Sequence, residues 1–148
     1  MKKQTQIKVG VVISMILLTV TVAHAQSASQ RFTATIPFEF NVGEQTLPAG
    51  DYEIAIANPS SDQRVLRIRS TGGTQNVMLT THMVSSESTN AAKLVFRGYG
   101  EHHFLAQAWT GVDQNGLETP KSKAEKRYSN EFPAAQRRMD AVSLNRSR

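Results

Sequence analysis

The stretch that decides the fold is residues 31–42, which read R-F-T-A-T-I-P-F-E-F-N-V. Every second residue from Phe32 to Val42 is apolar, and the residues between them are mostly polar. Because neighbouring side chains of a strand point to opposite faces, this period of two predicts a β-strand with one buried face. Pro37 has no amide hydrogen for a strand ladder, so we expect the strand to lie at an edge or to be interrupted there.

Shorter runs with the same alternation follow along the chain. We expect strands over residues 51–56, 64–70, 75–81, 93–99 and 102–109, with turns at L-P-A-G (47–50) and at the glycine pair 72–73. In the run 64–70, Leu66 and Ile68 lie on the face opposite to that of Val65, Arg67 and Arg69. Short strands at regular spacing predict an all-β fold, an antiparallel β-sandwich or a small barrel.

The sequence changes character after residue 120. Ser122-Lys123-Ala124-Glu125 matches a helix capping box, in which a serine and a glutamate satisfy free N–H groups at the helix start. We therefore expect a short helix over 123–128, a second helical piece over 130–145 with Pro133 in its first turn, and disorder from 145 onward. The all-β domain thus carries a short C-terminal helical tail.

The first residues predict a targeting signal rather than an element of the fold. Three lysines precede an apolar run over residues 9–22, and A-H-A follows at 23–25. This order is typical of a secretory signal peptide, here residues 1–25, with cleavage before Gln26. The apolar run is shorter than the ~20 residues that span a bilayer, which disfavours an uncleaved anchor. We expect an exported protein, periplasmic or extracellular, with no integral membrane segment after cleavage.

The charges divide the rest of the chain into two parts. Residues 26–120, the expected β-rich domain, carry six basic and nine acidic side chains, whereas residues 121–148, a basic, helical and partly disordered tail, carry eight basic and three. A mildly acidic body disfavours nucleic acid as a partner. The basic tail favours an anionic envelope polymer, a glycan or a protein. The chain has no cysteine, which excludes disulfides, thiolate metal sites and cysteine nucleophiles.

Several short motifs occur in a fixed order between residues 32 and 125. They include I-P-F-E-F at 36–40, L-P-A-G-D-Y at 47–52, L-V-F at 94–96 and P-K-S-K-A-E at 120–125. In this order the chain resembles a family of small exported β-rich proteins typical of acidobacterial genomes. The resemblance implies an exported location and a β-rich fold, and it brings no activity, cofactor or catalytic residue with it.

Candidate ligands for a metal are few. His82, Glu101 and His103 form a three-ligand site only if the strand register brings His82 beside the other two. His102 and His103 are neighbours in a strand and therefore point to opposite faces, so they do not chelate one ion together. We favour the interpretation that these are ordinary surface residues, and we predict no metal and no cofactor.

Material for binding is somewhat better than material for catalysis. Tyr99, Trp109 and Gln107 combine aromatic faces with an amide, as sugar or peptide sites do, and Arg67 and Arg69 share one strand face. The alternative is that Trp109 belongs to the core and that the arginines are solvated. For Trp109 we favour the interpretation that it belongs to the core.

Catalytic patterns are weaker still. The sequence has neither a G-x-S-x-G elbow nor an H-E-x-x-H motif. Glu39 and Glu53 are a carboxylate pair only if their strands lie side by side. We therefore predict no catalytic residue. We expect an exported, non-catalytic β-domain that is a binding or structural component of the cell envelope. The alternative is a hydrolase of an envelope or extracellular polymer with a site at Glu101 and His103.

Overall fold

The computed structural model describes residues 30–59, 61, 63–86, 91–112 and 114–147. The predicted signal peptide and its cleavage site lie outside the described residues. The described elements are β1 (Arg31–Ile36), β2 (Phe40–Val42), β3 (Gln45–Leu47), β4 (Gly50–Ile56), β5 (Arg64–Ser70), β6 (Asn76–Ser85), β7 (Lys93–Tyr99), β8 (His102–Trp109), β9 (Asn115–Glu118), α2 (Lys123–Glu131), the 3-10 helix η1 (Ala134–Gln136), β10 (Arg137–Ser143) and β11 (Asn145–Arg146). No helix within these ranges is long and apolar enough to cross a membrane.

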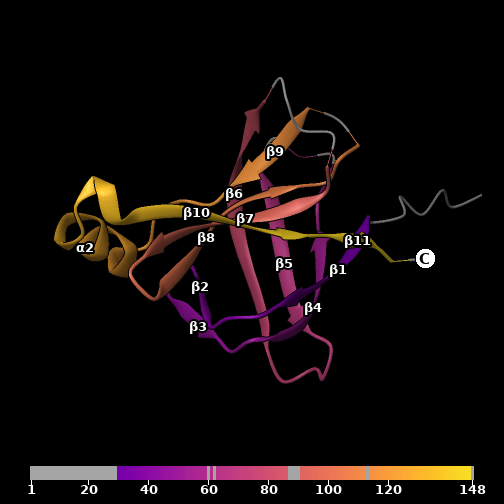
Figure 1. The fold of residues 1–148 in the computed structure, drawn as a ribbon. Coiled ribbons are helices and arrows are strands. Elements are labelled where there is room, and N and C mark those ends of the chain that lie inside the picture. Colours follow the sequence, from indigo (N-terminus) through magenta and orange to yellow (C-terminus); the bar gives the residue numbers. More distant parts are fainter. Residues whose placement is uncertain (1–29, 60, 62, 87–90, 113, 148) are drawn as a thin grey trace, which may run out of the picture.

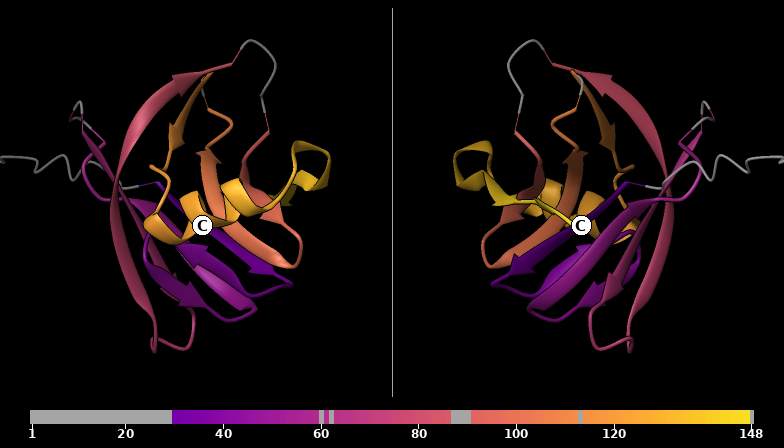
Figure 2. Two further views of the ribbon diagram at one scale, coloured as in Figure 1. Left: turned by 90° about the vertical axis from the view of Figure 1, so that its left-hand side faces the viewer. Right: turned by 90° about the vertical axis from the view of Figure 1, so that its right-hand side faces the viewer.

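The strands form one open sheet that curls around a single core (Figures 1 and 2). Their order is β10-β7-β8-β9-β6-β5-β4-β1-β11, and β2 pairs with β3 and β8. β10 and β11 stand at the two ends of this order although only Leu144 separates them in the chain, and β1 contacts β10. The predicted all-β class is confirmed. The sheet is mixed rather than purely antiparallel, because β2 runs parallel to β8 at Asn41 and Phe104.

The alternation over residues 31–42 is confirmed, and Pro37 divides it into two strands. Phe32, Ile36 and Phe40 are buried. β1 pairs with β4, whereas β2 pairs with β3 and β8. The chain therefore passes from one part of the sheet to another at Pro37, where the ladder lacks a donor.

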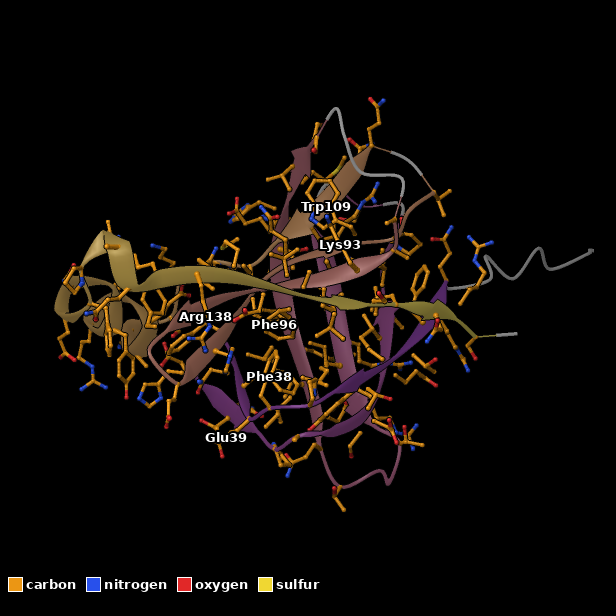
Figure 3. The ribbon with its side chains drawn as sticks, viewed as in Figure 1. Phe38, Glu39, Lys93, Phe96, Trp109 and Arg138 are labelled. Carbon is orange, nitrogen blue, oxygen red and sulfur yellow. The ribbon has the colours of Figure 1, made fainter. Side chains whose placement is uncertain are left out.

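Aromatic side chains fill the centre of the core. Phe40 meets Tyr52 and Phe96 edge to face, with ring centroids 5.2 and 5.5 Å apart. Phe38 also meets Phe96 edge to face, at 5.2 Å (Figure 3). These contacts join β2, β4 and β7, which are distant in the chain, so the alternating residues act together as one core.

Two features of the sheet differ from the sequence-based expectation. β6 is longer than predicted and bends, because residues 76–81 pair with β5 while 82–85 pair with β9, a strand that we did not predict. A bulge in the β7–β8 pair shifts the register between Val95 and Phe96. Leu105 and Ala108 consequently both reach the core, although simple alternation placed them on opposite faces.

The C-terminal region contains the predicted short helix but no second one. Ser122 caps α2, and its Oγ accepts a hydrogen bond from the Glu125 amide. The helix ends at Glu131, and its C-cap Phe132 is extended because a residue that precedes proline, here Pro133, avoids the helical conformation. Residues 137–143 then form β10 along the edge of β7. The expected helix over 130–145 and the expected disorder from 145 onward are therefore wrong for the described residues, since Asn145–Arg146 pairs with β1.

Candidate functional site

A pocket of about 200 Å³ opens where β4 and β8 end and β5 and β9 begin. We call it the mouth pocket. Its lining residues are Gln30, Ile56, Pro59, Arg64, Thr110, Val112, Asn115 and Leu117. Residues 60, 62 and 113, which adjoin the lining in the chain, lie outside the described residues. The pocket combines an apolar surface with one cation and a few neutral polar groups, as small-molecule sites commonly do.

Arg64 is the cation of the mouth pocket, and strand geometry turns it inward. It is the first residue of β5 and shares its side-chain face with Leu66 and Ile68, which are buried in the core. The backbone around it is fixed on both sides. The Asn58 side-chain amide donates to the carbonyl of Gln63 at 2.6 Å, and its oxygen accepts from the Val65 amide. The buried Thr81 hydroxyl donates to the Arg64 carbonyl at 2.8 Å.

The guanidinium of Arg64 makes neither a hydrogen bond nor an ion pair with any residue that the structure describes, and its Nε is buried. A buried donor without an acceptor costs about 1–3 kcal/mol, and more when it is charged. Arginine carries five donors in a fixed planar fork that matches a carboxylate or a phosphate. The arrangement is suited to an anion that enters the pocket.

The floor of the mouth pocket lies directly over the hydrophobic core. A cavity of about 10 Å³ beneath it shares Ile56, Thr110 and Leu117 with the pocket. Phe32, Ile54 and Leu66 line the deeper side of that cavity. Ile56 and Leu117 are only 6% and 2% exposed and close the bottom of the pocket. The exposed apolar side chains of the lining are Pro59 and Val112.

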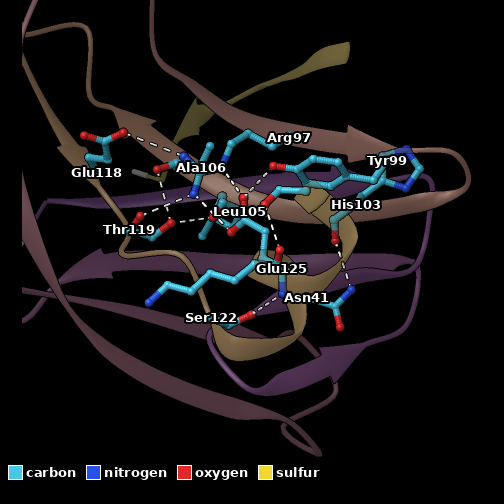
Figure 4. A network of polar contacts seen from close by, with 12 residues as sticks. Asn41, Arg97, Tyr99, His103, Leu105, Ala106, Glu118, Thr119, Ser122 and Glu125 are labelled. Atoms are coloured by element: carbon cyan, nitrogen blue, oxygen red, sulfur yellow. Dashed lines mark hydrogen bonds and ion pairs between the residues drawn. The ribbon is translucent and has the colours of Figure 1, made fainter. Parts of the chain in front are cut away.

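A second arginine, largely buried, has a very different environment. Arg97 on β7 is 14% exposed and donates from Nη2 to Glu125 Oε2 at 3.2 Å, while its Nε bonds to Oε1 of the same carboxylate (Figure 4). It also approaches Glu118 Oε1 at 3.7 Å and the Thr119 carbonyl at 3.4 Å. The carboxylate of Glu125, only 2% exposed, accepts a further bond from the Tyr99 hydroxyl at 3.2 Å. This network attaches α2 to the outer side of β7.

The same network explains why the capping box is only half complete. Ser122 caps the helix as predicted, but the Glu125 carboxylate accepts hydrogen bonds from Arg97 and Tyr99. Burial raises the pKa of Tyr99 above its ordinary value of 10.0, and the charge of Glu125 raises it further. The phenol is accordingly a donor within a structural network.

His103 lies under β10. Its ring stacks on Phe38 with centroids 3.9 Å apart, and its Nε2 lies 3.0 Å from Arg138 Nη2 and 3.4 Å from Asp140 Oδ2. An arginine can only donate, so Nε2 is the acceptor of that bond and the imidazole is neutral. Burial lowers the pKa of His103 below its ordinary 6.5 and the charge of Arg138 lowers it further, while Asp140 opposes both. The histidine is a packing contact between β8 and β10.

The three candidate metal ligands are not brought together. His82 is exposed on β6 opposite Glu118, Glu101 is exposed in the turn before β8, and His103 is buried. Among the residues that the structure describes, no group of three potential ligands could hold a metal ion.

The predicted aromatic binding residues are interior groups. Tyr99 is 2% and Trp109 is 5% exposed. The indole Nε1 donates to Gln107 Oε1 at 3.1 Å, and the ring lies so close to Gly116 that a methyl group there would be 2.7 Å from it. The face of Trp109 therefore covers β9 and is not open to a ligand.

The predicted charged residues lie on the outer face of the sheet, away from the mouth pocket. Arg67 pairs with Glu53 at 3.4 Å, and Arg69 is exposed beside the same glutamate. Glu39 lies outside the strands, and the cross-strand neighbours of Glu53 are Thr33 and Arg69. The condition for a carboxylate pair of Glu39 with Glu53 is therefore not met.

The sequence reasoning missed Arg64. The run 64–70 already places it on the parity of Leu66 and Ile68, so an arginine facing the core side was readable from the sequence. The lining residues come from three separate parts of the chain, at residue 30, between residues 56 and 64 and between residues 110 and 117, and nothing in the sequence indicates that these parts meet.

Comparisons with known proteins leave the site to be judged on its geometry. No family model, no curated protein and no solved structure matches the chain. The resemblance to the exported acidobacterial proteins remains a prediction.

Proposed function

We propose that this protein is an exported, non-catalytic binding domain of the cell envelope and that the mouth pocket is its binding site. One observation carries the proposal: Arg64 faces inward at the edge of a 200 Å³ pocket with no partner for its guanidinium among the described residues. Charged groups held in this way favour binding because little reorganisation is needed when a ligand arrives. The hydrolase alternative gains no support, since Glu101 is exposed and His103 is covered by Phe38.

The binding part of the proposal is tested by an NMR titration of the chain from Gln26 onward. A panel of small acidic, neutral and basic organic molecules is added one at a time to isotope-labelled protein. We expect amide shifts to cluster around Ile56, Arg64 and Leu117 for at least one member of the panel. Shifts that cluster elsewhere on the sheet, or no shifts at all, would contradict the proposal.

The export part is tested by the intact mass of the protein recovered outside the cytoplasm. We expect a chain that begins at Gln26, and we expect Ala25→Leu to retain the leader because the peptidase requires a small residue there. Recovery of the wild-type chain with residues 1–25 attached would contradict the export prediction.

The basic C-terminal region supports a second contact, with an anionic envelope polymer. Lys121, Lys123, Lys126 and Arg127 are exposed at and along α2. If they attract such a polymer, its binding weakens as salt rises and weakens further when the four residues are changed to glutamine. Equal binding by the wild type and this variant at low salt would exclude the contact.

A further inference from the structure

We propose that the mouth pocket binds a small organic carboxylate, with the carboxylate on Arg64 and an apolar part on Pro59 and Val112. The inference rests on the proposed function and adds the class of ligand. The cation selects the charge of the ligand. Arg64 is the only charged residue among the described lining residues, so none of these residues offers a carboxylate that competes with an anion for its guanidinium.

The exposed apolar part of the lining selects an organic ligand over an inorganic anion. Pro59 and Val112 are exposed in the lining, so this surface gains from contact with apolar groups. A phosphate or sulfate ion would satisfy Arg64 and leave that surface in contact with water. A neutral sugar would cover this surface and leave the guanidinium without an anion.

The size of the pocket limits the ligand. Its 200 Å³ lies below the roughly 300–1,000 Å³ of drug-sized sites and equals the liquid volume of about seven water molecules. A carboxylate with one aromatic ring or a short aliphatic chain fits this space. Benzoate and hexanoate are therefore suitable probes.

The backbone that carries Arg64 is also held in place before a ligand arrives. Asn58 fixes the backbone on both sides of Arg64, and Thr81 fixes its carbonyl. Because the strand position is already ordered, binding needs only a rearrangement of the arginine side chain.

The experiment is a calorimetric titration of the chain from Gln26 onward with benzoate and with hexanoate. Benzamide serves as a neutral match in shape, and inorganic phosphate serves as an anion without an apolar part. Arg64→Gln removes the charge, and Arg67→Gln removes a charge from the outer face of the same strand. We expect Arg64→Gln to weaken benzoate about tenfold or more, since bonds to charged groups contribute that much. Arg67→Gln should change the affinity less than twofold, and Arg64→Lys should fall between Arg64→Gln and the wild type.

Three outcomes overturn the inference: no binding of either carboxylate, phosphate binding at least as tightly as benzoate, or equal losses in Arg64→Gln and Arg67→Gln. The titration also separates this inference from the proposed function. If benzamide shifts the amides of the mouth pocket and benzoate does not, the ligand class is wrong while the pocket remains a binding site. If nothing shifts those amides, both proposals fail. Thermal unfolding of each variant confirms that it is folded at the titration temperature.

Discussion

Arg97 and Arg64 are both arginines on strands of the same sheet, and their surroundings are opposite. Arg97 faces a carboxylate on both of its edges and a backbone carbonyl as well, so its donors are used within the protein. Arg64 has a fixed backbone and an inward side chain, yet its guanidinium has no partner among the described residues. The first arginine attaches a helix to the sheet. The second has no partner among the described residues and is the arginine that we propose binds a ligand.

The comparison shows how to separate a structural charge from a binding charge within one protein. A charge that stabilises the fold has its partner in the chain, and removing it leaves that partner buried alone. A charge that serves a ligand lacks a partner, so its removal affects binding more than folding. Stability and affinity should therefore respond to different arginines.

The largest effect is expected from removing the structural side of the comparison altogether. Deletion of residues 121–148 takes away Glu125, the β10 partner of β7 and the β11 partner of β1. We expect no cooperative unfolding transition by circular dichroism, because two edges of the sheet and a buried ion pair are lost together. A chain that ends at Ser147 is the control and should unfold cooperatively. A deletion variant with a native-like transition would mean that this region is an appendage.

Arg97→Leu should produce the next largest effect. It leaves the Glu125 carboxylate buried without its charged partner, and we expect a loss of about 3 kcal/mol of unfolding free energy in urea. In the double variant Arg97→Leu/Glu125→Leu, most of this loss should be recovered because neither charge remains buried alone. A double variant less stable than Arg97→Leu would show that the pair is not coupled in this way.

A smaller loss of unfolding free energy is expected when the pH falls. It arises from His103, which lies beneath β10. The pKa of folded His103 lies below 6.5, so the unfolded chain binds the extra proton first and stability declines as the pH falls below about 6.5. One proton limits the slope to about 1.4 kcal/mol per pH unit. Urea unfolding at pH 7.5, 6.5 and 5.5 measures it. His103→Gln should flatten this slope, and an unchanged slope in that variant would assign the dependence to other groups.

Arg64→Leu should have the smallest effect on stability. No partner among the described residues is left behind, and a leucine in this inward position replaces a buried unsatisfied donor. We expect the unfolding free energy to change by less than about 1 kcal/mol, in the direction of a gain. A loss as large as that of Arg97→Leu would remove the distinction between the two arginines.

Local pattern predicted much of the sheet, because alternation and turn residues act over a few positions. β1 ends directly before Pro37, as expected for a residue without an amide hydrogen, and Ser122 caps α2. The sequence gives no comparable signal for β10, whose strand conformation depends on the free edge of β7 about forty residues earlier. The helix was predictable from Glu125, but the destination of its carboxylate was not, since the contact with Arg97 depends on how α2 docks.

The pairing of Phe32 with Arg146 has a consequence for the order of events during synthesis and transport. The first strand of the sheet finds one of its neighbours more than a hundred residues later, so the finished fold cannot assemble while that segment is still missing. Contacts this distant in the chain slow folding. A newly made chain would stay loosely organised until residues 137–146 emerge, which is the state that the proposed export would require.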